Sequence, residues 1–216
     1  MGNVAHAFSL PFKTPGWFPR LLVIGLITLV PVIGWMNTTG WMLATLDNYR
    51  RGAAELPPAG FQYIGRGAAL FLVQLVYAIL IAIVLVVPVF LLTMGTGGLR
   101  GGPSSGGFNG SFTGIAQLVS LAEYTFLPAV VLGTERGGIP GGFNFPEIWR
   151  MASSNWKNSL LAAILIYAAG YVGFLGFFAC CVGILVSYPY SVAVVAGIIR
   201  FYEATFEPPQ QVTQAY

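Results

Sequence analysis

The chain has 216 residues, of which 56% are hydrophobic and only 8% are charged, and its ten basic and seven acidic residues give a formal net charge of +3. Long uncharged runs of this kind exclude an ordinary water-soluble core and predict one integral membrane domain over residues 1–216. The basic residues are spread through the connecting segments without a basic run, so nucleic-acid binding has no support.

The first apolar block runs over residues 21–46. As one helix it would be about 39 Å long, more than the ~30 Å hydrocarbon core of a bilayer. Pro31 and Gly40 fall inside it, and proline removes a backbone hydrogen bond while glycine weakens a helix. We therefore expect a break between Pro31 and Gly40 and a hairpin with segments over 17–33 and 36–50. Each segment is short, so the hairpin either spans at a strong tilt or re-enters on the same side.

The rest of the chain predicts four more membrane segments and one flexible glycine-rich loop. The stretch 146–158 has the pattern of an interfacial amphipathic helix, because Trp149 and Trp156 are typical of headgroup depth. The fold class is therefore all-α: a polytopic transmembrane helix bundle with about five to six membrane segments, a broken or re-entrant first hairpin and one interfacial amphipathic helix. The later segments are 67–94, 112–133 with a kink at Pro128, 146–179 and 183–203, and the loop is 95–111.

The placement of basic residues favours the hairpin over a single crossing. With a hairpin, nine of the ten basic residues lie on one side and only Arg100 lies opposite, whereas a single crossing gives seven against three. The positive-inside rule then puts both termini in the cytoplasm. The nine residues are Lys13, Arg20, Arg50, Arg51, Arg66, Arg136, Arg150, Lys157 and Arg200.

Glu123 lies in the middle of an uncharged stretch, at the depth of the predicted membrane. A carboxylate in hydrocarbon is costly unless it is protonated, paired or facing a wet cavity. No Lys, Arg or His falls within an apolar stretch, so the available neighbours are hydroxyls and amides such as Gln74, Tyr77 and Gln117. We expect a neutral, hydrogen-bonded carboxyl, which either joins two helices as Asn or Gln would or forms part of a transport site. We rank the first interpretation above the second.

Nothing in the sequence points to catalysis. There is no Ser/His/Asp set, no pair of membrane carboxylates and no nucleotide motif, so we expect a protein that is not an enzyme. Cys180 and Cys181 are adjacent in an apolar run, where we expect packing residues, and His6 stands alone. We therefore expect no metal site and no cofactor.

Two sets of residues carry a structural and a functional interpretation each. Tyr49 is expected at the interface beside arginines that either contact lipid headgroups or, as we favour, act as positive-inside anchors. A row of glycines, one every three residues, forms a smooth stripe for close approach of another helix in this bundle or in a partner. The arginines are Arg50, Arg51 and Arg66, and the glycines are Gly170, Gly173 and Gly176.

Several positions along the first half of the chain carry a resemblance. They are Trp17, Ile24, Gly25, Pro31, Gly40, Arg50, Glu55, Leu56 and Pro57, and the run from Cys180 to Tyr190 adds a further match. Together they resemble a prokaryotic membrane family catalogued as domain of unknown function 4013. Trp41 stands where that family has Tyr, and Pro58 stands where an aromatic residue often follows Leu-Pro. The resemblance implies a six-helix-like membrane fold, with localisation in a prokaryotic inner membrane, and no particular chemistry.

The sequence thus predicts a non-catalytic polytopic membrane protein. We expect a structural or accessory subunit of a larger membrane complex, since the loops are short and catalytic groups are absent. The alternative is a small transporter, channel or lipid or ion carrier that uses Glu123 at membrane depth. The expected partners are membrane lipids and either a larger membrane complex or further copies of the chain.

Overall fold

The computed structural model describes residues 6–95, 105–178 and 182–206, and all regular elements in these ranges are helical. This confirms the all-α fold class. Cys180 and Cys181 lie outside the described residues. The elements are α1 (His6–Ser9), the 3-10 helix η1 (Leu10–Lys13), α2 (Trp17–Thr28), α3 (Ile33–Arg50), α4 (Ile64–Gly95), α5 (Ser105–Gly142), α6 (Phe145–Ser154), α7 (Trp156–Leu175), the 3-10 helix η2 (Gly176–Phe178) and α8 (Val182–Phe206).

Three helical stretches in the described ranges are long and apolar enough to cross a membrane. They are Ile64–Val84 in α4, Trp156–Phe178 in α7 and η2, and Gly183–Thr205 in α8. A protein with three such helices fits membrane localisation. Helix α2 is also apolar but has only 12 residues, so it is shorter than an ordinary span.

The first apolar block is two helices, with the break at Pro31. Helix α2 ends at Thr28 and α3 begins at Ile33. Gly40, by contrast, does not interrupt the chain and lies inside α3. Its role is a close contact with Gly67 of α4, because a Cβ atom on Gly67 would lie 2.5 Å from the Gly40 backbone nitrogen. The break is therefore narrower than the predicted Pro31 to Gly40.

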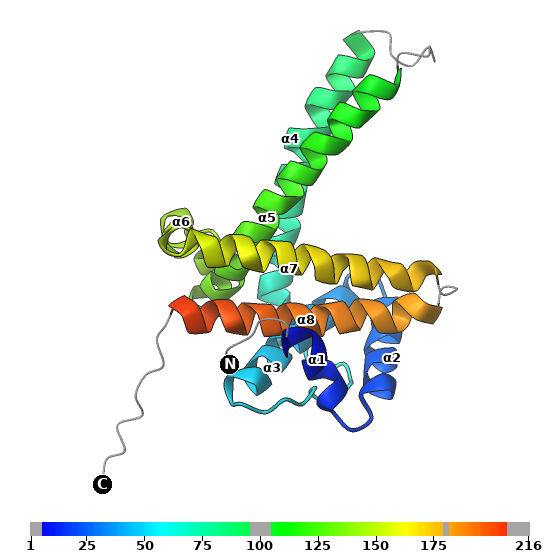
Figure 1. The fold of residues 1–216 in the computed structure, drawn as a ribbon, viewed down its shortest axis with the longest axis vertical. Coiled ribbons are helices and arrows are strands. Elements are labelled where there is room, and N and C mark those ends of the chain that lie inside the picture. Colours follow the sequence, from blue (N-terminus) through cyan, green and yellow to red (C-terminus); the bar gives the residue numbers. More distant parts are fainter. Residues whose placement is uncertain (1–5, 96–104, 179–181, 207–216) are drawn as a thin grey trace.

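Helix α5 is longer than the sequence predicts at both ends. It begins at Ser105, inside the range 95–111 that was expected to be a loop, and it continues to Gly142. Figure 1 shows α5 running alongside α4 in the opposite direction, and this packing supports a helix through glycine-rich sequence. Pro128, where a kink was expected, lies inside α5, and its backbone angles are helical, as they also are at a proline bend. The backbone leaves helical angles at Gly138, where φ is 61° and only glycine is unstrained.

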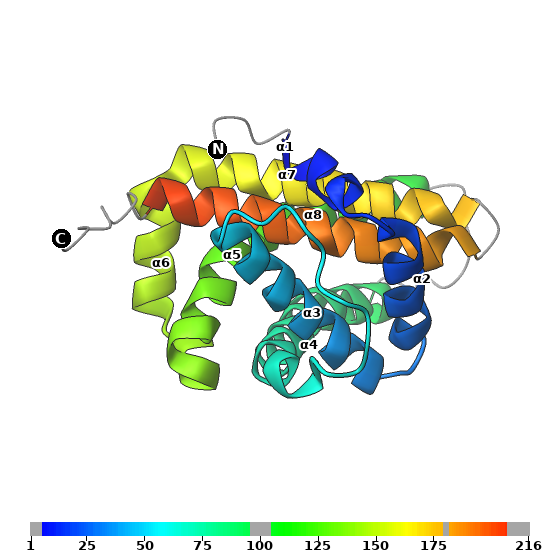
Figure 2. The same ribbon diagram turned by 90° about the horizontal axis from the view of Figure 1, so that it is seen from below.

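The two long helical pairs cross steeply. In Figure 1 the α4–α5 pair projects away from the α7–α8 pair, while α2 and α3 pack on the other side of α8 (Figure 2). Helix α8 is central because it contacts α7, α3 and α2. The largest cluster of buried side chains joins α3, α4, α5, α7 and α8 and includes Leu46, Leu70, Leu132, Ile166 and Ile198. This core packs α3, α4, α5 and α8 together, and their charged residues meet at one end of it, as described below.

The glycine stripe on α7 is used in part. Cβ atoms added at Gly173 or Gly176 would meet Ser191 or Ser187 of α8, so both glycines allow the two helices to approach closely. Gly170 faces open space, with nothing within 4 Å of an added Cβ atom. Two of the three predicted packing glycines thus contact a helix of this same chain.

Helix α6 is an amphipathic helix, as the sequence predicts for 146–158, and the expected segment 146–179 consists of this helix, α7 and η2. Its Ile148 and Met151 are buried, whereas Trp149 is 64% exposed. The side chain of Asn144 accepts a hydrogen bond from the backbone N–H of Glu147, which caps the start of the helix. A short break at Asn155 turns the chain into α7.

Candidate functional site

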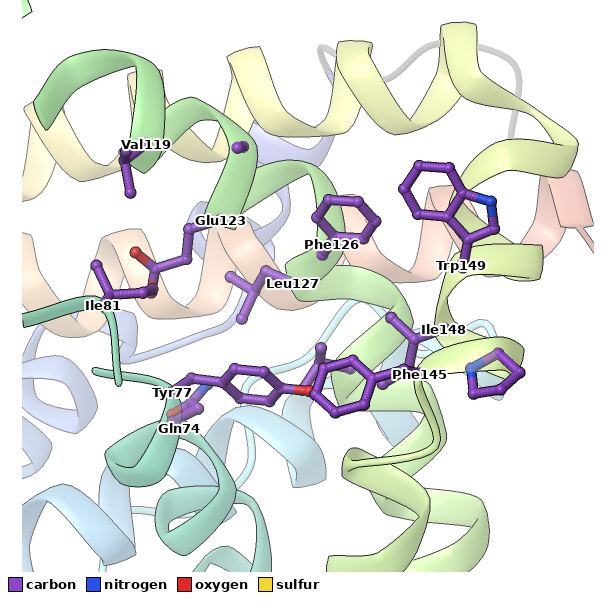
Figure 3. A pocket seen from close by; sticks show the side chains of 13 residues that line it. Gln74, Tyr77, Ile81, Val119, Glu123, Phe126, Leu127, Phe145, Ile148 and Trp149 are labelled. Carbon is purple, nitrogen blue, oxygen red and sulfur yellow. The ribbon is translucent and has the colours of Figure 1, made fainter. Parts of the chain in front are cut away.

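An apolar cleft of about 660 Å³ lies between α4, α5 and α6. We call it the α4–α6 cleft. Its apolar lining includes Ile81 of α4, Val119 and Leu127 of α5, and Ile148 of α6. A volume of this size falls within the range of small-molecule pockets, about 300 to 1,000 Å³. Figure 3 shows the side chains of all three helices pointing into the same space.

Aromatic rings form one wall of the cleft and fix α6 in place. The rings of Phe126 and Trp149 stack with centroids 5.8 Å apart and planes 24° apart, which joins α5 to α6. Tyr77 of α4 meets Phe145 edge to face, with centroids 6.2 Å apart. The Tyr77 hydroxyl donates a hydrogen bond of 2.8 Å to the backbone oxygen of Gly142. The wall is therefore built from all three helices (Figure 3).

Glu123 of α5 lines this cleft together with Gln74 and Tyr77 of α4. Figure 3 shows its carboxyl group directed towards Ile81, on the same side of the cleft as Tyr77. No hydrogen bond or ion pair joins the carboxyl to any other residue that the structure describes. The expected inter-helix hydrogen bond of Glu123 is therefore not formed among these residues, and the carboxyl is left available to a ligand.

Gln117 does not belong to the cleft, although the sequence grouped it with Glu123. Its side-chain oxygen accepts a hydrogen bond from the Tyr167 hydroxyl of α7, and that hydroxyl lies 3.0 Å from the Tyr171 hydroxyl. Gln117 and Glu123 are six residues apart, which is about 240° around a helix at 3.6 residues per turn. The two side chains therefore leave α5 on different faces.

A second polar feature is centred on Arg50, at the end of α3. Its Nη2 lies 2.7 Å from Oε2 of Glu135 in α5 and 2.8 Å from Oε1 of Glu203 in α8. Its Nε donates to Glu203 Oε2 at 2.9 Å, and its Nη1 lies 3.1 Å from Oδ1 of Asp47. The Glu135 and Glu203 side chains are only 14% and 12% exposed. One guanidinium thus ties three helices together.

Two more arginines complete this arrangement. Arg66 of α4 pairs with Asp47, and its Nη2 lies 3.2 Å from Glu135 Oε1. Arg200 of α8 lies 3.2 Å from Glu203 Oε2. Three positive and three negative groups therefore balance where four helices meet. We call this set the ion-pair cluster: Asp47, Arg50, Arg66, Glu135, Arg200 and Glu203.

The cluster shifts the pKa values of Asp47 and Arg50, its two members on α3, in the directions that favour their charged forms. Burial acts to raise the pKa of Asp47, but the hydrogen bonds and charges of Arg66 and Arg50 outweigh it and hold this pKa below its ordinary value. Burial acts to lower the pKa of Arg50, but Glu203 and Glu135 raise it further than burial lowers it. Both groups therefore stay charged at neutral pH, and the ion pairs of the cluster hold the helices together.

The lipid-headgroup candidates and Tyr49 lie in surroundings that the sequence did not suggest. Arg50 and Arg66 are paired within the cluster, so their guanidinium groups face protein carboxylates. Arg51 is exposed and donates to the side chain of Asn48. Tyr49 was expected at the interface but is only 1% exposed, because its ring joins the main core. Arg51 alone of the three arginines remains outside the cluster.

Sequence reasoning missed the apolar lining of the cleft and the acidic members of the cluster. The α5 lining positions recur at three- and four-residue steps, which is the spacing of one helix face, so periodicity could have grouped them with Glu123. The acids had a weaker signal: each lies at a segment end on the side where the basic residues were placed. The missed residues are Val119, Ala122, Phe126, Leu127 and Val130 in the α5 lining, and Asp47, Glu135 and Glu203 in the cluster.

A comparison with protein families gives a match for this chain. No curated protein and no solved structure matches the chain. A family model described as "Protein of unknown function (DUF4013)" matches residues 23–182, well over half of the sequence. That range contains all residues that line the α4–α6 cleft and four of the six members of the ion-pair cluster. The match confirms the resemblance found in the sequence, and the chain belongs to the DUF4013 family.

Proposed function

We propose that this protein is a non-catalytic polytopic membrane protein that binds a lipid-like molecule in the α4–α6 cleft, as a carrier or lipid-binding component. The observation that carries this proposal is the cleft itself, an apolar space of about 660 Å³ with few polar groups. One of its walls, with Gln74, Tyr77 and Ile81, lies in the stretch Ile64–Val84 that is apolar enough to cross a membrane. In a bilayer that wall would lie at the depth of the hydrocarbon, so a lipid-like ligand could enter the cleft laterally from the membrane.

The proposed membrane arrangement has α4 with α5, and α7 with α8, as pairs that enter and return. Its support is the contact of Arg66, near the start of α4, with Glu135, near the end of α5. Glu203, near the end of α8, contacts Arg50 of the same cluster. Because the pairs cross steeply, at least one of them is tilted in the bilayer (Figure 1). The basic-residue count favours cytoplasmic termini, with α2 and α3 as the shorter hairpin, and the family resemblance favours a prokaryotic inner membrane.

The proposed function is tested by filling the cleft. Ala122 lines it, so Ala122→Trp should occupy the space that an alkyl chain needs. The matched control is Leu75→Trp, since Leu75 is exposed on α4 and does not line the cleft. We would measure binding of pyrene-labelled hexadecanol to the purified protein in nanodiscs. We expect Ala122→Trp to weaken binding by about ten-fold or more and Leu75→Trp to leave it unchanged. Equal binding by wild type and Ala122→Trp would contradict the proposal.

A second candidate function, an accessory subunit of a larger membrane complex, is favoured by one surface. The rings of Phe174 and Phe177 stack in parallel with centroids 6.1 Å apart, and Phe178 beside them is 75% exposed. Such a ridge suits close packing against another helix as well as lipid. Extraction in a mild detergent followed by mass spectrometry should then reveal a stoichiometric foreign subunit. Loss of that subunit from Phe177→Ala and its retention in Phe12→Ala, a control at a similarly exposed phenylalanine, would support this candidate.

A further inference from the structure

The lining of the α4–α6 cleft carries charge of one sign only. Among the 13 described residues that line it, Glu123 is acidic and none is Lys, Arg or His. The arginines of the ion-pair cluster contact carboxylates of that cluster, and none of them lines the cleft. An unpaired carboxylate in apolar surroundings is unfavourable and is stabilised by a positively charged partner. The missing charge is therefore one that a ligand can bring.

The hydrogen-bonding groups of the cleft are mostly acceptors. The Tyr77 proton is committed to the backbone oxygen of Gly142, so the Tyr77 oxygen offers only lone pairs to the cleft. Once a cationic ligand favours its ionised form, the carboxylate of Glu123 accepts hydrogen bonds and donates none. Gln74 contributes one amide, with an acceptor oxygen and a donor nitrogen. The cleft is therefore better suited to a ligand group with several N–H donors than to one with several acceptors.

The aromatic wall adds a second preference for positive charge. Phe126 and Trp149 form one stacked pair and Tyr77 and Phe145 an edge-to-face pair, all lining the same space as Glu123 (Figure 3). The faces of such rings attract an ammonium group, most strongly in an apolar setting. A carboxylate beside several aromatic rings is therefore suited to a cation attached to an apolar body.

We propose that the α4–α6 cleft recognises a lipophilic amine from the membrane, with one ammonium group at Glu123, an alkyl body along Ile81, Val119 and Leu127, and no anionic group. This inference rests on the proposed function and names the ligand class of the same cleft. A fatty acid would place a second negative charge beside Glu123. A zwitterionic phospholipid would bring a phosphate into a cleft whose described lining has no basic side chain.

The test compares ligands of equal chain length in nanodiscs of phosphatidylcholine. Hexadecylamine, hexadecanol and hexadecanoate would each be used to displace pyrene-labelled hexadecanol from the full-length protein. We expect hexadecylamine to displace the probe at a concentration about ten-fold lower than hexadecanol, and hexadecanoate to be the weakest. Equal displacement by the amine and the alcohol would overturn this inference and leave the proposed function standing. Failure of the labelled probe to bind at all would overturn both.

A variant and its matched control test whether the preference depends on Glu123. Glu123→Gln should bring hexadecylamine to parity with hexadecanol, while probe binding itself persists. The matched control is Glu147→Gln, which removes a carboxylate on α6 that pairs with Arg150 and does not line the cleft. If Glu123→Gln does not fold, Trp149→Leu should still reduce the preference for the amine more than it reduces hexadecanol binding. Retention of the full amine preference in Glu123→Gln, or in Trp149→Leu where Glu123→Gln does not fold, would contradict the proposal.

Discussion

Arg50 and Glu135 lie 85 residues apart in sequence and are joined by a 2.7 Å contact between Nη2 and Oε2. Because Glu135 and Glu203 are largely buried, removing Arg50 leaves two carboxylates without their shared partner. Exposed ion pairs contribute under ~1 kcal/mol and the loss of one partner of a buried pair costs about 3–5 kcal/mol. Arg50 is 27% exposed, so we expect Arg50→Ala to lower the free energy of unfolding by about 2 kcal/mol or more.

The neighbouring arginine provides the control for that prediction. Arg51 is exposed and contacts only the side chain of Asn48 among the interactions described above. Arg51→Ala should therefore change the free energy of unfolding by less than about 0.5 kcal/mol. Both variants would be unfolded by titration with a denaturing detergent. Equal stability of the two variants would show that the ion-pair cluster does not hold the four helices together.

Acid should weaken the protein in part through Asp47. The folded-state pKa of its carboxyl is lowered, so the unfolded state binds a proton more readily, near its ordinary pKa of about 3.9. The contribution of Asp47 to stability is then fully present above that pH and is lost as the pH falls through the folded-state value. We expect the stability difference between wild type and Asp47→Asn to shrink as the pH falls below about 4. A difference that stays constant down to the lowest accessible pH would rule this out.

Two glycine-to-alanine variants test the close contact between α3 and α4. Gly67→Ala alters the contact, and Gly65→Ala is the matched control. An added Cβ on Gly67 would lie 3.0 Å from the Gly40 Cα and closer still to other backbone atoms, whereas Gly65 has nothing within 4 Å. We expect Gly67→Ala to cost about 1–3 kcal/mol through overpacking. Gly65→Ala should be neutral or stabilising by up to about 1 kcal/mol, because alanine favours a helix. Thermal unfolding in detergent separates the two, and a stable Gly67→Ala would disprove the tight contact.

Two buried tyrosines should respond to loss of the hydroxyl in opposite directions. Tyr49 and Tyr202 are each 1% exposed. Within the described part of the chain the Tyr49 hydroxyl has no hydrogen-bond partner, while the Tyr202 hydroxyl donates to the Met151 backbone oxygen at 2.8 Å. Tyr49→Phe should be stabilising by about 1 kcal/mol and Tyr202→Phe destabilising by a similar amount. Comparable destabilisation of both would mean that Tyr49 has a polar partner.

The apolar segments were predictable because length and lack of charge alone identify them. Helices α4, α7 and α8 each contain an uncharged or nearly uncharged run long enough for a bilayer, and Pro31 marks the turn between α2 and α3. The start of α5 was not predictable, since its glycine-rich sequence has low helix propensity and gains its stability from packing against α4. The kink at Gly138 was equally hidden, because several glycines nearby could adopt a positive φ.

The candidate site was predictable only in its polar part. Glu123, Gln74 and Tyr77 stand out because few polar groups occur in the apolar segments, and the structure brings these three together. The contribution of Phe145 and Trp149 depends on how α6 folds back against α5, which no local pattern encodes. The pairing of Arg50 with Glu135 likewise depends on tertiary packing.

The position of Gly138 has a mechanical consequence for α5. Helical backbone angles hold along α5 up to that residue, so Glu123 in the cleft and Glu135 in the ion-pair cluster belong to one continuous helix. Their 12-residue separation corresponds to about 18 Å along the axis. A molecule that displaces this helix when it enters the cleft would therefore move Glu135 relative to Arg50. Helix α5 thus connects the α4–α6 cleft and the ion-pair cluster within a single element.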